Sequence, residues 1–191
     1  DHGESLGEHD YFFDHGENLF DPSLRIPLVV AGPGVKAGHR SGVLASTLDL
    51  VPTVLDAVKV SYPPDLAGES VWPSAQGGSR PNRKRLQAQN DRNLIGVWDR
   101  QFKIVATPEG DRASYALFDR KADPGETRDQ SKARPDDLRV QKRELELYRQ
   151  RVDGEWARTR RLVEGQSGEP RLSREACEKL MAMGYVQQGC Q

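Results

Sequence analysis

Acidic and imidazole side chains that could bind a metal ion gather at the start of this chain. Three of its four histidines lie within the first fifteen residues. The same window contains five carboxylates, those of Asp1, Glu4, Glu8, Asp10 and Asp14. Carboxylate oxygens and imidazole nitrogens are both ligands of divalent cations. The pattern therefore predicts a divalent-metal or anion site, although a solvated acidic loop would have the same composition.

Apolar runs around this loop predict the elements that would position it. Residues 26–31 form an apolar run that is typical of a buried strand, and a short helical turn is expected over 19–24. Apolar side chains recur at helical spacing at Leu48, Val51, Leu55 and Val58. They predict a helix that begins near Leu50, with Asp49 as its cap rather than as a catalytic acid. A loop, a buried strand and a helix in this order predict an α/β scaffold.

The second half of the chain changes to closely spaced short strands. Three strand candidates are residues 94–98, 102–106 and 114–118. Connections this short imply antiparallel hairpins. The Asp-Pro-Gly-Glu-Thr run at 123–127 is turn chemistry and is expected to be structural. A charged helix with a loose apolar stripe is predicted over 135–161, and a last short helix over 174–183.

Charge divides the chain into two parts. Residues 1–78 carry eleven acidic and four basic side chains, whereas residues 79–191 carry eighteen acidic and twenty-four basic ones. We therefore expect two domains that meet at this boundary. An acidic first part suits a cation site. The second part interleaves both signs, which favours a solvated helical surface over a patch that binds nucleic acid.

The amino-acid composition argues against a membrane-spanning protein and against a fold held together by disulfides. Of the 191 residues, 36% are hydrophobic and 30% are charged. No apolar run approaches the roughly 20 residues that a membrane-spanning helix needs. The two cysteines, Cys177 and Cys190, are too few for a disulfide framework and lack the spacing of a Cys-x-x-Cys metal clip. The redox compartment is therefore left open by the sequence.

The motifs of the first thirty residues resemble those of a known family. In order, they are Asp1-His2-Gly3-Glu4, Leu6-Gly7-Glu8-His9, His15-Gly16 and Arg25-Ile26-Pro27-Leu28. Their order and spacing resemble the metal-binding segment of the formylglycine-dependent sulfatases, which belong to the alkaline-phosphatase superfamily. The resemblance implies an α/β fold: part of an alkaline-phosphatase-like α/β sandwich over residues 1–78, then a small C-terminal antiparallel sheet with helices over residues 79–191.

The resemblance also implies roles for individual residues. Asp1 and His2 fall on a pair of metal ligands, for which Ca²⁺ is expected, while ligand chemistry alone would also allow Mn²⁺ or Zn²⁺. His15 falls on the basic catalytic residue that meets the sulfate or the leaving group, where many relatives carry Lys. The substrate would be a sulfated small molecule or glycan. The family nucleophile is a Cys or Ser in Cys/Ser-x-Pro/Ala-x-Arg, and neither Cys177 nor Cys190 lies in that motif.

We therefore expect this chain to be the C-terminal part of a sulfatase whose nucleophile and remaining acidic metal ligands lie upstream. Alone, it is expected to lack sulfatase activity and to bind calcium weakly. The resemblance favours a periplasmic or secreted location. Two alternatives stay open: a phosphatase or phosphodiesterase of the same superfamily, and a non-catalytic binding module with a basic helical tail. An upstream Cys-x-Pro-x-Arg box, a Ser or Thr nucleophile, or no nucleophile would distinguish the three.

Overall fold

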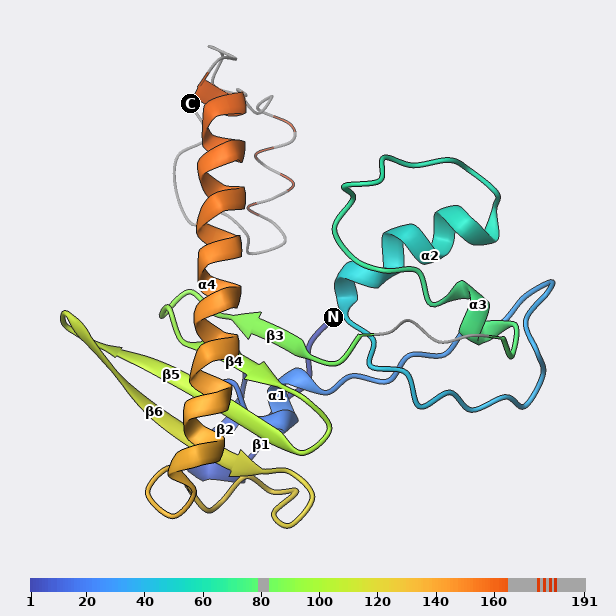
Figure 1. The fold of residues 1–191 in the computed structure, drawn as a ribbon. Coiled ribbons are helices and arrows are strands. Elements are labelled where there is room, and N and C mark those ends of the chain that lie inside the picture. Colours follow the sequence, from blue (N-terminus) through green and yellow to red (C-terminus); the bar gives the residue numbers. More distant parts are fainter. Residues whose placement is uncertain (79–82, 165–174, 176, 178, 180, 182–191) are drawn as a thin grey trace. The chain divides into compact units, whose positions relative to one another are not determined.

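The computed structural model describes residues 1–78 and 83–164, together with residues 175, 177, 179 and 181. It forms two compact units, Asp1–Arg149 and Gln150–Gln191. The strands and helices in Figure 1 are β1 Ser5–Leu6, β2 Phe12–Asp14, α1 Asp21–Leu24, α2 Leu50–Ala57, α3 Trp72–Ala75, β3 Leu86–Gln89, β4 Ile95–Trp98, β5 Phe102–Glu109, β6 Arg112–Asp119 and α4 Pro135–Glu164. Within these ranges, every helix is too short or too polar to cross a membrane.

A four-stranded antiparallel sheet, in the order β3-β4-β5-β6, forms the centre of the first unit (Figure 1). In the long β5–β6 hairpin, Phe102 pairs with Asp119 at one end and Glu109 with Arg112 at the other. The last three strands confirm the hairpins predicted over residues 94–118. β3 was not predicted, because its polar stretch becomes a strand only by pairing along the edge of β4.

Apolar side chains on the two faces of this sheet form separate cores. One core consists of Val97, Phe102, Ile104, Ala106, Leu117 and Leu145. The other consists of Leu19, Val105 and Phe118. Ile104 and Val105 are neighbours in β5 but belong to different cores, as the two-residue period of a strand requires. Leu145 of α4 thus covers one face, and Leu19, just after the acidic loop, covers the other.

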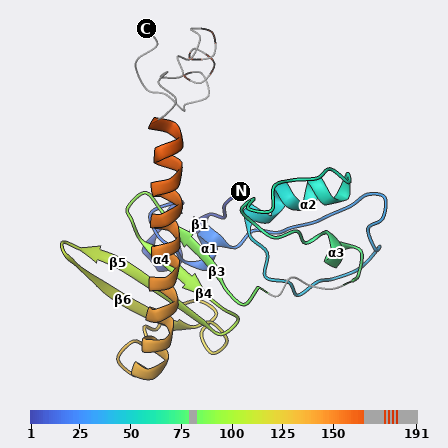
Figure 2. The ribbon, with the colours of Figure 1, turned by 45° about the horizontal axis from the view of Figure 1, so that its top comes forward.

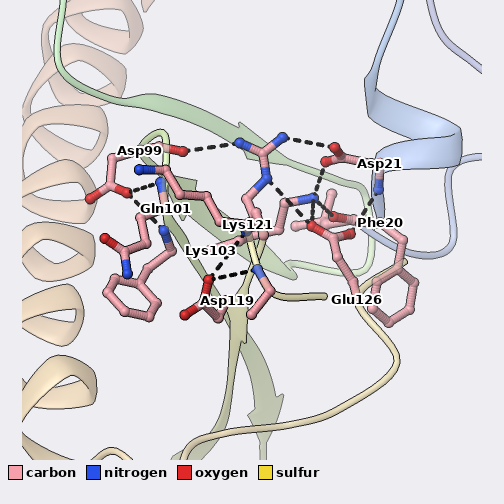
Figure 3. Close-up of polar contacts among 12 residues, drawn as sticks. Phe20, Asp21, Asp99, Gln101, Lys103, Asp119, Lys121 and Glu126 are labelled. Carbon is pink, nitrogen blue, oxygen red and sulfur yellow. Dashed lines mark hydrogen bonds and ion pairs between the residues drawn. The ribbon is translucent and has the colours of Figure 1, made fainter. Parts of the chain in front are cut away.

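A buried ion-pair network attaches α1 to the second face of the sheet (Figure 3). The Nζ of Lys103, a fully buried residue of β5, lies 2.6 Å from Asp21 Oδ1 and 2.6 Å from Glu126 Oε1. Arg120 Nη2 lies 2.7 Å from Asp21 Oδ2, and the Asp21 N–H donates to Glu126 Oε2 at 2.9 Å. Burial raises the pKa of Asp21, but Lys103 and Arg120 outweigh it and hold this pKa below its ordinary value. The turn over 123–127 is structural, as predicted, because it supplies Glu126.

The helix predicted after residue 46 is confirmed as α2. Asp49 stands at its N-cap position, but the Asp49 side chain makes no capping bond to α2 and instead caps the preceding 3₁₀ turn, Thr47–Asp49. The Asp49 carboxylate accepts the N–H groups of Ser46 and Glu69, each at 2.8 Å, and completes a capping box with Ser46. Arg83 binds the same carboxylate through both terminal nitrogens, with Nη2 at 2.7 Å. Burial raises the pKa of Asp49, but these hydrogen bonds lower it by more, so the pKa lies below its ordinary value. The short α3 packs beside α2 (Figure 2).

Residues 26–31 correct the prediction of a buried strand. They have no regular secondary structure, and the side chains of Leu28 and Val29 are exposed, the latter by 88%. A buried strand needs hydrogen-bonding neighbours at its edges and packed layers on its faces. The described part of the chain provides neither for this segment. The described part of the chain is therefore a mixed α/β arrangement of small antiparallel sheets and helices.

The charged helix predicted over 135–161 is confirmed as α4, which begins at Pro135, where a missing N–H costs nothing. The short helical turn predicted over 19–24 is confirmed as α1, with Pro22 in its first turn. Of the last predicted helix, residues 175, 177, 179 and 181 are helical, and the rest of it lies outside the described residues. Cys177 is disulfide-bonded and so is not a free thiol.

Candidate metal and anion site

The backbone of the acidic loop, residues 1–16, is strained. Its strands β1 and β2 pair in antiparallel fashion with an irregular register. His9, Asp10 and Phe13 have φ angles of 57°, 55° and 51°. Left-handed backbone of this kind costs about 1–3 kcal/mol for a non-glycine residue and is common at functional sites, where the surrounding structure maintains it. Contacts with the rest of the chain must therefore stabilise the conformation of this loop.

Gly3 attaches the start of the loop to α1. Its N–H donates to the carbonyl oxygen of Ser23 at 2.9 Å. A Cβ at this position would lie 1.9 Å from the carbonyl oxygen of Pro22, so only glycine permits the approach. Because α1 is itself fixed to the sheet by Lys103, the two residues before Gly3 are connected to the core through a short chain of contacts.

Four side chains of the loop converge into one exposed cluster, formed by Asp1, His2, Glu4 and His15. The rings of His2 and His15 stack with their centroids 3.6 Å apart. Glu4 Oε2 lies 3.2 Å from His15 Nδ1, and Asp1 Oδ1 lies 3.8 Å from His2 Nε2. In the described part of the chain, His2, Glu4 and His15 are the one group of three potential ligands whose donor atoms all lie within 4.8 Å of one another. Of the residues to which the sequence assigned roles, the structure therefore brings His2 and His15 together, while Asp1 contacts its neighbour His2.

Hydrogen bonds determine which ring nitrogens are available in this cluster. His2 Nδ1 lies 2.7 Å from the Gly3 carbonyl oxygen. A carbonyl only accepts, so Nδ1 carries the proton and the lone pair of His2 is on Nε2, the atom that faces Asp1. The Glu4 carboxylate likewise accepts a hydrogen bond from His15 Nδ1 at 3.2 Å. Asp14 accepts the backbone N–H of His15 at 2.8 Å, and this bond helps to fix its position.

Glu4 is the member of the cluster to which the sequence assigned no role. It belongs to the same Asp-His-Gly-Glu motif, two residues from His2, and this spacing was the available signal. Other acids of the loop bond to the backbone instead. Glu8 Oε2 accepts the Leu6 N–H at 2.7 Å, and backbone hydrogen bonds lower the pKa of Glu8. Of the five carboxylates in the window, that of Glu4 contacts a histidine ring at hydrogen-bond distance, whereas Asp1 Oδ1 accepts the backbone N–H of His2 at 3.1 Å and lies 3.8 Å from the His2 ring nitrogen.

A groove of about 1530 Å³ opens beside the first two residues of the cluster. Apolar residues of 28–31 and 43–45 line it. Five lysine or arginine residues also line it, namely Arg25, Lys36, Arg40, Arg100 and Arg120. Arg120 is already paired with Asp21, and Arg100 donates to the carbonyl oxygen of Gly42. Cationic groups around a groove attract anionic ligands, so this surface suits a negatively charged substrate.

The donor atoms of the cluster fit a divalent cation, but not equally for all cations. Asp1 and Glu4 offer carboxylate oxygens, and His2 and His15 offer imidazole nitrogens. Calcium takes six to eight oxygen ligands, so these four side chains cannot complete a calcium shell by themselves. A calcium ion held by Asp1 and His2 would need further oxygen ligands from other residues.

Comparisons with known proteins place the chain in a family. The family described as N-sulphoglucosamine sulphohydrolase, C-terminal, matches residues 7–151. Arylsulfatase K of Xenopus laevis is 30% identical over 139 residues, which cover 66% of this chain and 26% of the relative. The Delta 4,5-hexuronate-2-O-sulfatase of Bacteroides thetaiotaomicron is 28% identical over 148 residues, which cover 69% and 29%. The chain thus spans between a quarter and a third of the length of these curated relatives.

Solved structures also match this chain over about a third of their own length. A 2-O GAG sulfatase matches 82% of this chain with a TM-score of 0.70 and 25% identity, over 36% of its own length. A protein in complex with its substrate D-glucosamine-2-N,6-O-disulfate matches 82% of the chain with a TM-score of 0.66 and 26% identity, over 33% of its length. The phosphonate monoester hydrolase of Silicibacter pomeroyi matches 78% with a TM-score of 0.70 and 24% identity, over 33% of its length, and shows a shared fold alone.

Proposed function

Because the chain belongs to the sulfatase family and matches its C-terminal region, we propose that the full-length protein hydrolyses sulfate esters. It does so with a divalent metal and with a formylglycine nucleophile located upstream of this chain. The observation that carries the proposal is the stacking of His2, which contacts Asp1, on His15 in one exposed cluster. Their roles come from the family motif, whereas their proximity comes from the structure. A loop that only solvated its acids would not need the two histidine rings to meet.

Asp1 and His2 would hold the metal, which by family resemblance is Ca²⁺, with Mn²⁺ as the alternative. When bound, such an ion neutralises sulfate oxygens that otherwise repel a nucleophile. His15 would act on the leaving group. With Nδ1–H bonded to Glu4, a protonated His15 donates from Nε2 to the departing oxygen. The nucleophile is not supplied by Cys177 or Cys190, because neither lies in the required motif.

The substrate class we propose is a sulfated small molecule or glycan. One matched structure binds a sulfated glucosamine as its substrate, and another is a sulfatase of glycosaminoglycans. The basic residues that line the groove beside Asp1 and His2 favour an anionic ligand of this kind. Which sugar or alcohol carries the sulfate depends on residues outside this chain.

In the full-length protein, we propose that residues 1–78 belong to an alkaline-phosphatase-like α/β sandwich and residues 79–191 to a smaller C-terminal subdomain. The exposed apolar segment 26–31 supports this division, because its side chains suit a buried strand that lacks neighbours within the described part of the chain. Paired with strands from the remainder of the protein, this segment would bury Leu28 and Val29.

A phosphatase or phosphodiesterase of the same superfamily is the second candidate. The fold is compatible with both functions, since a phosphonate monoester hydrolase matches this chain with the same TM-score of 0.70 as a sulfatase does. Phosphate and sulfate esters place similar anionic oxygens on a metal, so the cluster alone suits both. The nucleophile upstream decides between them: a Cys-x-Pro-x-Arg box for a sulfatase, and an unmodified Ser or Thr for a phosphatase.

The test compares Asp1→Asn with Asp10→Asn in the full-length protein. Asp10 is an exposed acid of the same loop that lies outside the cluster, so it is a matched control. Asp1→Asn should reduce bound metal and aryl-sulfate turnover together, whereas Asp10→Asn should leave both near the wild-type values. Bound metal is measured by elemental analysis, and aryl phosphate is assayed in parallel. Unchanged metal stoichiometry in Asp1→Asn would reject the metal assignment, and faster turnover of the phosphate would favour the second candidate.

A further inference from the structure

The donor atoms of the cluster resemble the ligand set of a transition-metal ion more than that of calcium. Two imidazoles and a carboxylate, those of His2, His15 and Glu4, lie within 4.8 Å of one another. Imidazole nitrogen is a preferred ligand of Zn²⁺, Cu²⁺ and Ni²⁺, whereas Ca²⁺ selects oxygen. We propose that His2, Glu4 and His15 form a binding site for Zn²⁺ or a similar borderline ion, which shares His2 with the calcium role assigned to Asp1 and His2.

The spacing within the cluster supports this site. Ligand atoms bound about 2.0–2.1 Å from one tetrahedral ion lie about 3.3–3.4 Å apart. His15 Nδ1 and Glu4 Oε2 are 3.2 Å apart, so they already have this spacing. On binding, the proton of His15 Nδ1 moves to Nε2 through solvent, and the lone pair of Nδ1 replaces it toward the ion. The ring of His2 is stacked on that of His15 with the ring centroids 3.6 Å apart, so the second imidazole lies beside the first.

The hydrogen bonds behind the cluster also have the form that metal sites require. Histidine ligands almost always donate their second ring nitrogen to a carbonyl or a carboxylate, which fixes the tautomer. His2 does so through Nδ1 to the Gly3 carbonyl oxygen at 2.7 Å, and this leaves Nε2 as the donor to a metal. Asp1 lies 3.8 Å from that same nitrogen and can provide a fourth ligand. All four side chains are exposed, so an ion reaches them without any movement of the core.

One consequence rests on the proposed function. An ion bound by His15 Nδ1 and Glu4 removes the imidazole that would otherwise act on the leaving group. It also competes for His2 with the metal of the reaction. Zn²⁺ should therefore inhibit the full-length sulfatase, and added Ca²⁺ should relieve this inhibition only partly. The binding of Zn²⁺ to the cluster does not depend on this activity.

The experiment uses the 191-residue chain without a histidine tag and with a short Gly-Ser extension before Asp1, so that the α-amino group is not a ligand. ZnCl₂, CoCl₂ and CaCl₂ are titrated by calorimetry, and bound Co²⁺ is followed by its visible absorption. We expect Zn²⁺ to bind at least about tenfold more tightly than Ca²⁺. His2→Gln, Glu4→Gln and His15→Gln should each weaken Zn²⁺ by about tenfold or more, while His39→Gln, an exposed histidine outside the cluster, should not.

Each outcome decides the inference. Equal affinities for Zn²⁺ and Ca²⁺, unchanged Zn²⁺ affinity in Glu4→Gln and His15→Gln, or an equal loss in His39→Gln would overturn it. If circular dichroism shows that the chain alone does not fold, the same titrations on the full-length protein replace them. Zinc binding through these residues in a full-length protein without sulfatase activity would uphold the site and reject the proposed function. An active enzyme that binds no zinc through them would do the reverse.

Discussion

The exposed cluster of the acidic loop and the buried network around Lys103 are both made of opposite charges, yet they differ in what surrounds them. Lys103 is fully buried and has two carboxylates within 2.6 Å. The His15 side chain is 44% exposed and meets one carboxylate at 3.2 Å. A buried charge must be paired because an unpaired one is costly. An exposed group can keep free donor atoms at little cost. The network around Lys103 therefore stabilises the fold, whereas the exposed cluster is available to a ligand.

The largest loss of stability should follow removal of the buried ammonium. Lys103→Met leaves the carboxylates of Asp21 and Glu126 without their shared partner and should cost about 3–5 kcal/mol of unfolding free energy. Urea denaturation of the chain measures it. Lys121→Met, at an exposed lysine of the neighbouring turn, should change stability by no more than about 0.5 kcal/mol. Equal effects of the two variants would mean that the network does not hold α1 on the sheet.

The next largest loss of stability should follow removal of a contact between α4 and the sheet. Leu145 is 1% exposed and belongs to the core of the first face, whereas Leu147 on the same helix is 52% exposed. Leu145→Ala should therefore cost about 2–5 kcal/mol through lost burial and a residual cavity. Leu147→Ala should stay within about 0.5 kcal/mol. Denaturant midpoints compare the pair, and a similar loss for both leucines would contradict the described face of α4.

The Asp49–Arg83 pair should give a smaller, pH-dependent effect. Asp49→Asn weakens hydrogen bonds to a charged acceptor and should cost about 1.5–3 kcal/mol at neutral pH. The pKa of Asp49 is below its ordinary 3.8 in the folded chain, so the ionised group stabilises the fold above that pH. This contribution is lost as pH falls through the lowered pKa.

The difference in stability between wild type and Asp49→Asn should therefore shrink in urea titrations carried from pH 7 to below pH 3.8. Asp111→Asn in the exposed β5–β6 turn is the matched control. A difference that stays constant over this range would show that the Asp49 carboxylate contributes no ionisation-linked stability.

Periodicity made the sheet and the long helix predictable, because the apolar side chains that form those elements lie close together in the sequence. Strands β4, β5 and β6 and helix α4 depend on such local patterns. β3 and residues 26–31 could not be predicted correctly for the opposite reason. The polar Gln87 and Gln89 become part of a strand only because β4 lies beside them. The apolar segment 26–31 stays unpaired because no described strand is available to it.

The site was predictable to a similar extent. The family motif predicts roles for Asp1, His2 and His15, and these roles stay a prediction. Motif spacing alone could not show that Glu4 would reach His15 across eleven positions. Nor could the sequence reveal Lys103 as the centre of a buried network. A lysine inside a strand is expected on the surface, and its partners Asp21 and Glu126 lie 82 and 23 positions away along the chain. Only the folded backbone, with α1 and the 123–127 turn on one face of β5, brings these groups together.

The smallest effect on stability should come from the residue with the largest proposed role in catalysis. His15→Gln removes an exposed imidazole whose contacts are the stacked ring of His2 and the carboxylate of Glu4. Exposed pairs of this kind contribute little, so the free energy of unfolding should change by no more than about 0.5 kcal/mol. Sulfate-ester turnover of the full-length protein should nevertheless fall by about 10²-fold or more if this imidazole is the general acid. Urea denaturation and an aryl-sulfate assay on the same protein measure the two quantities. A loss of stability comparable to that of Leu145→Ala, with turnover unchanged, would instead make the cluster part of the structural framework, like the network around Lys103.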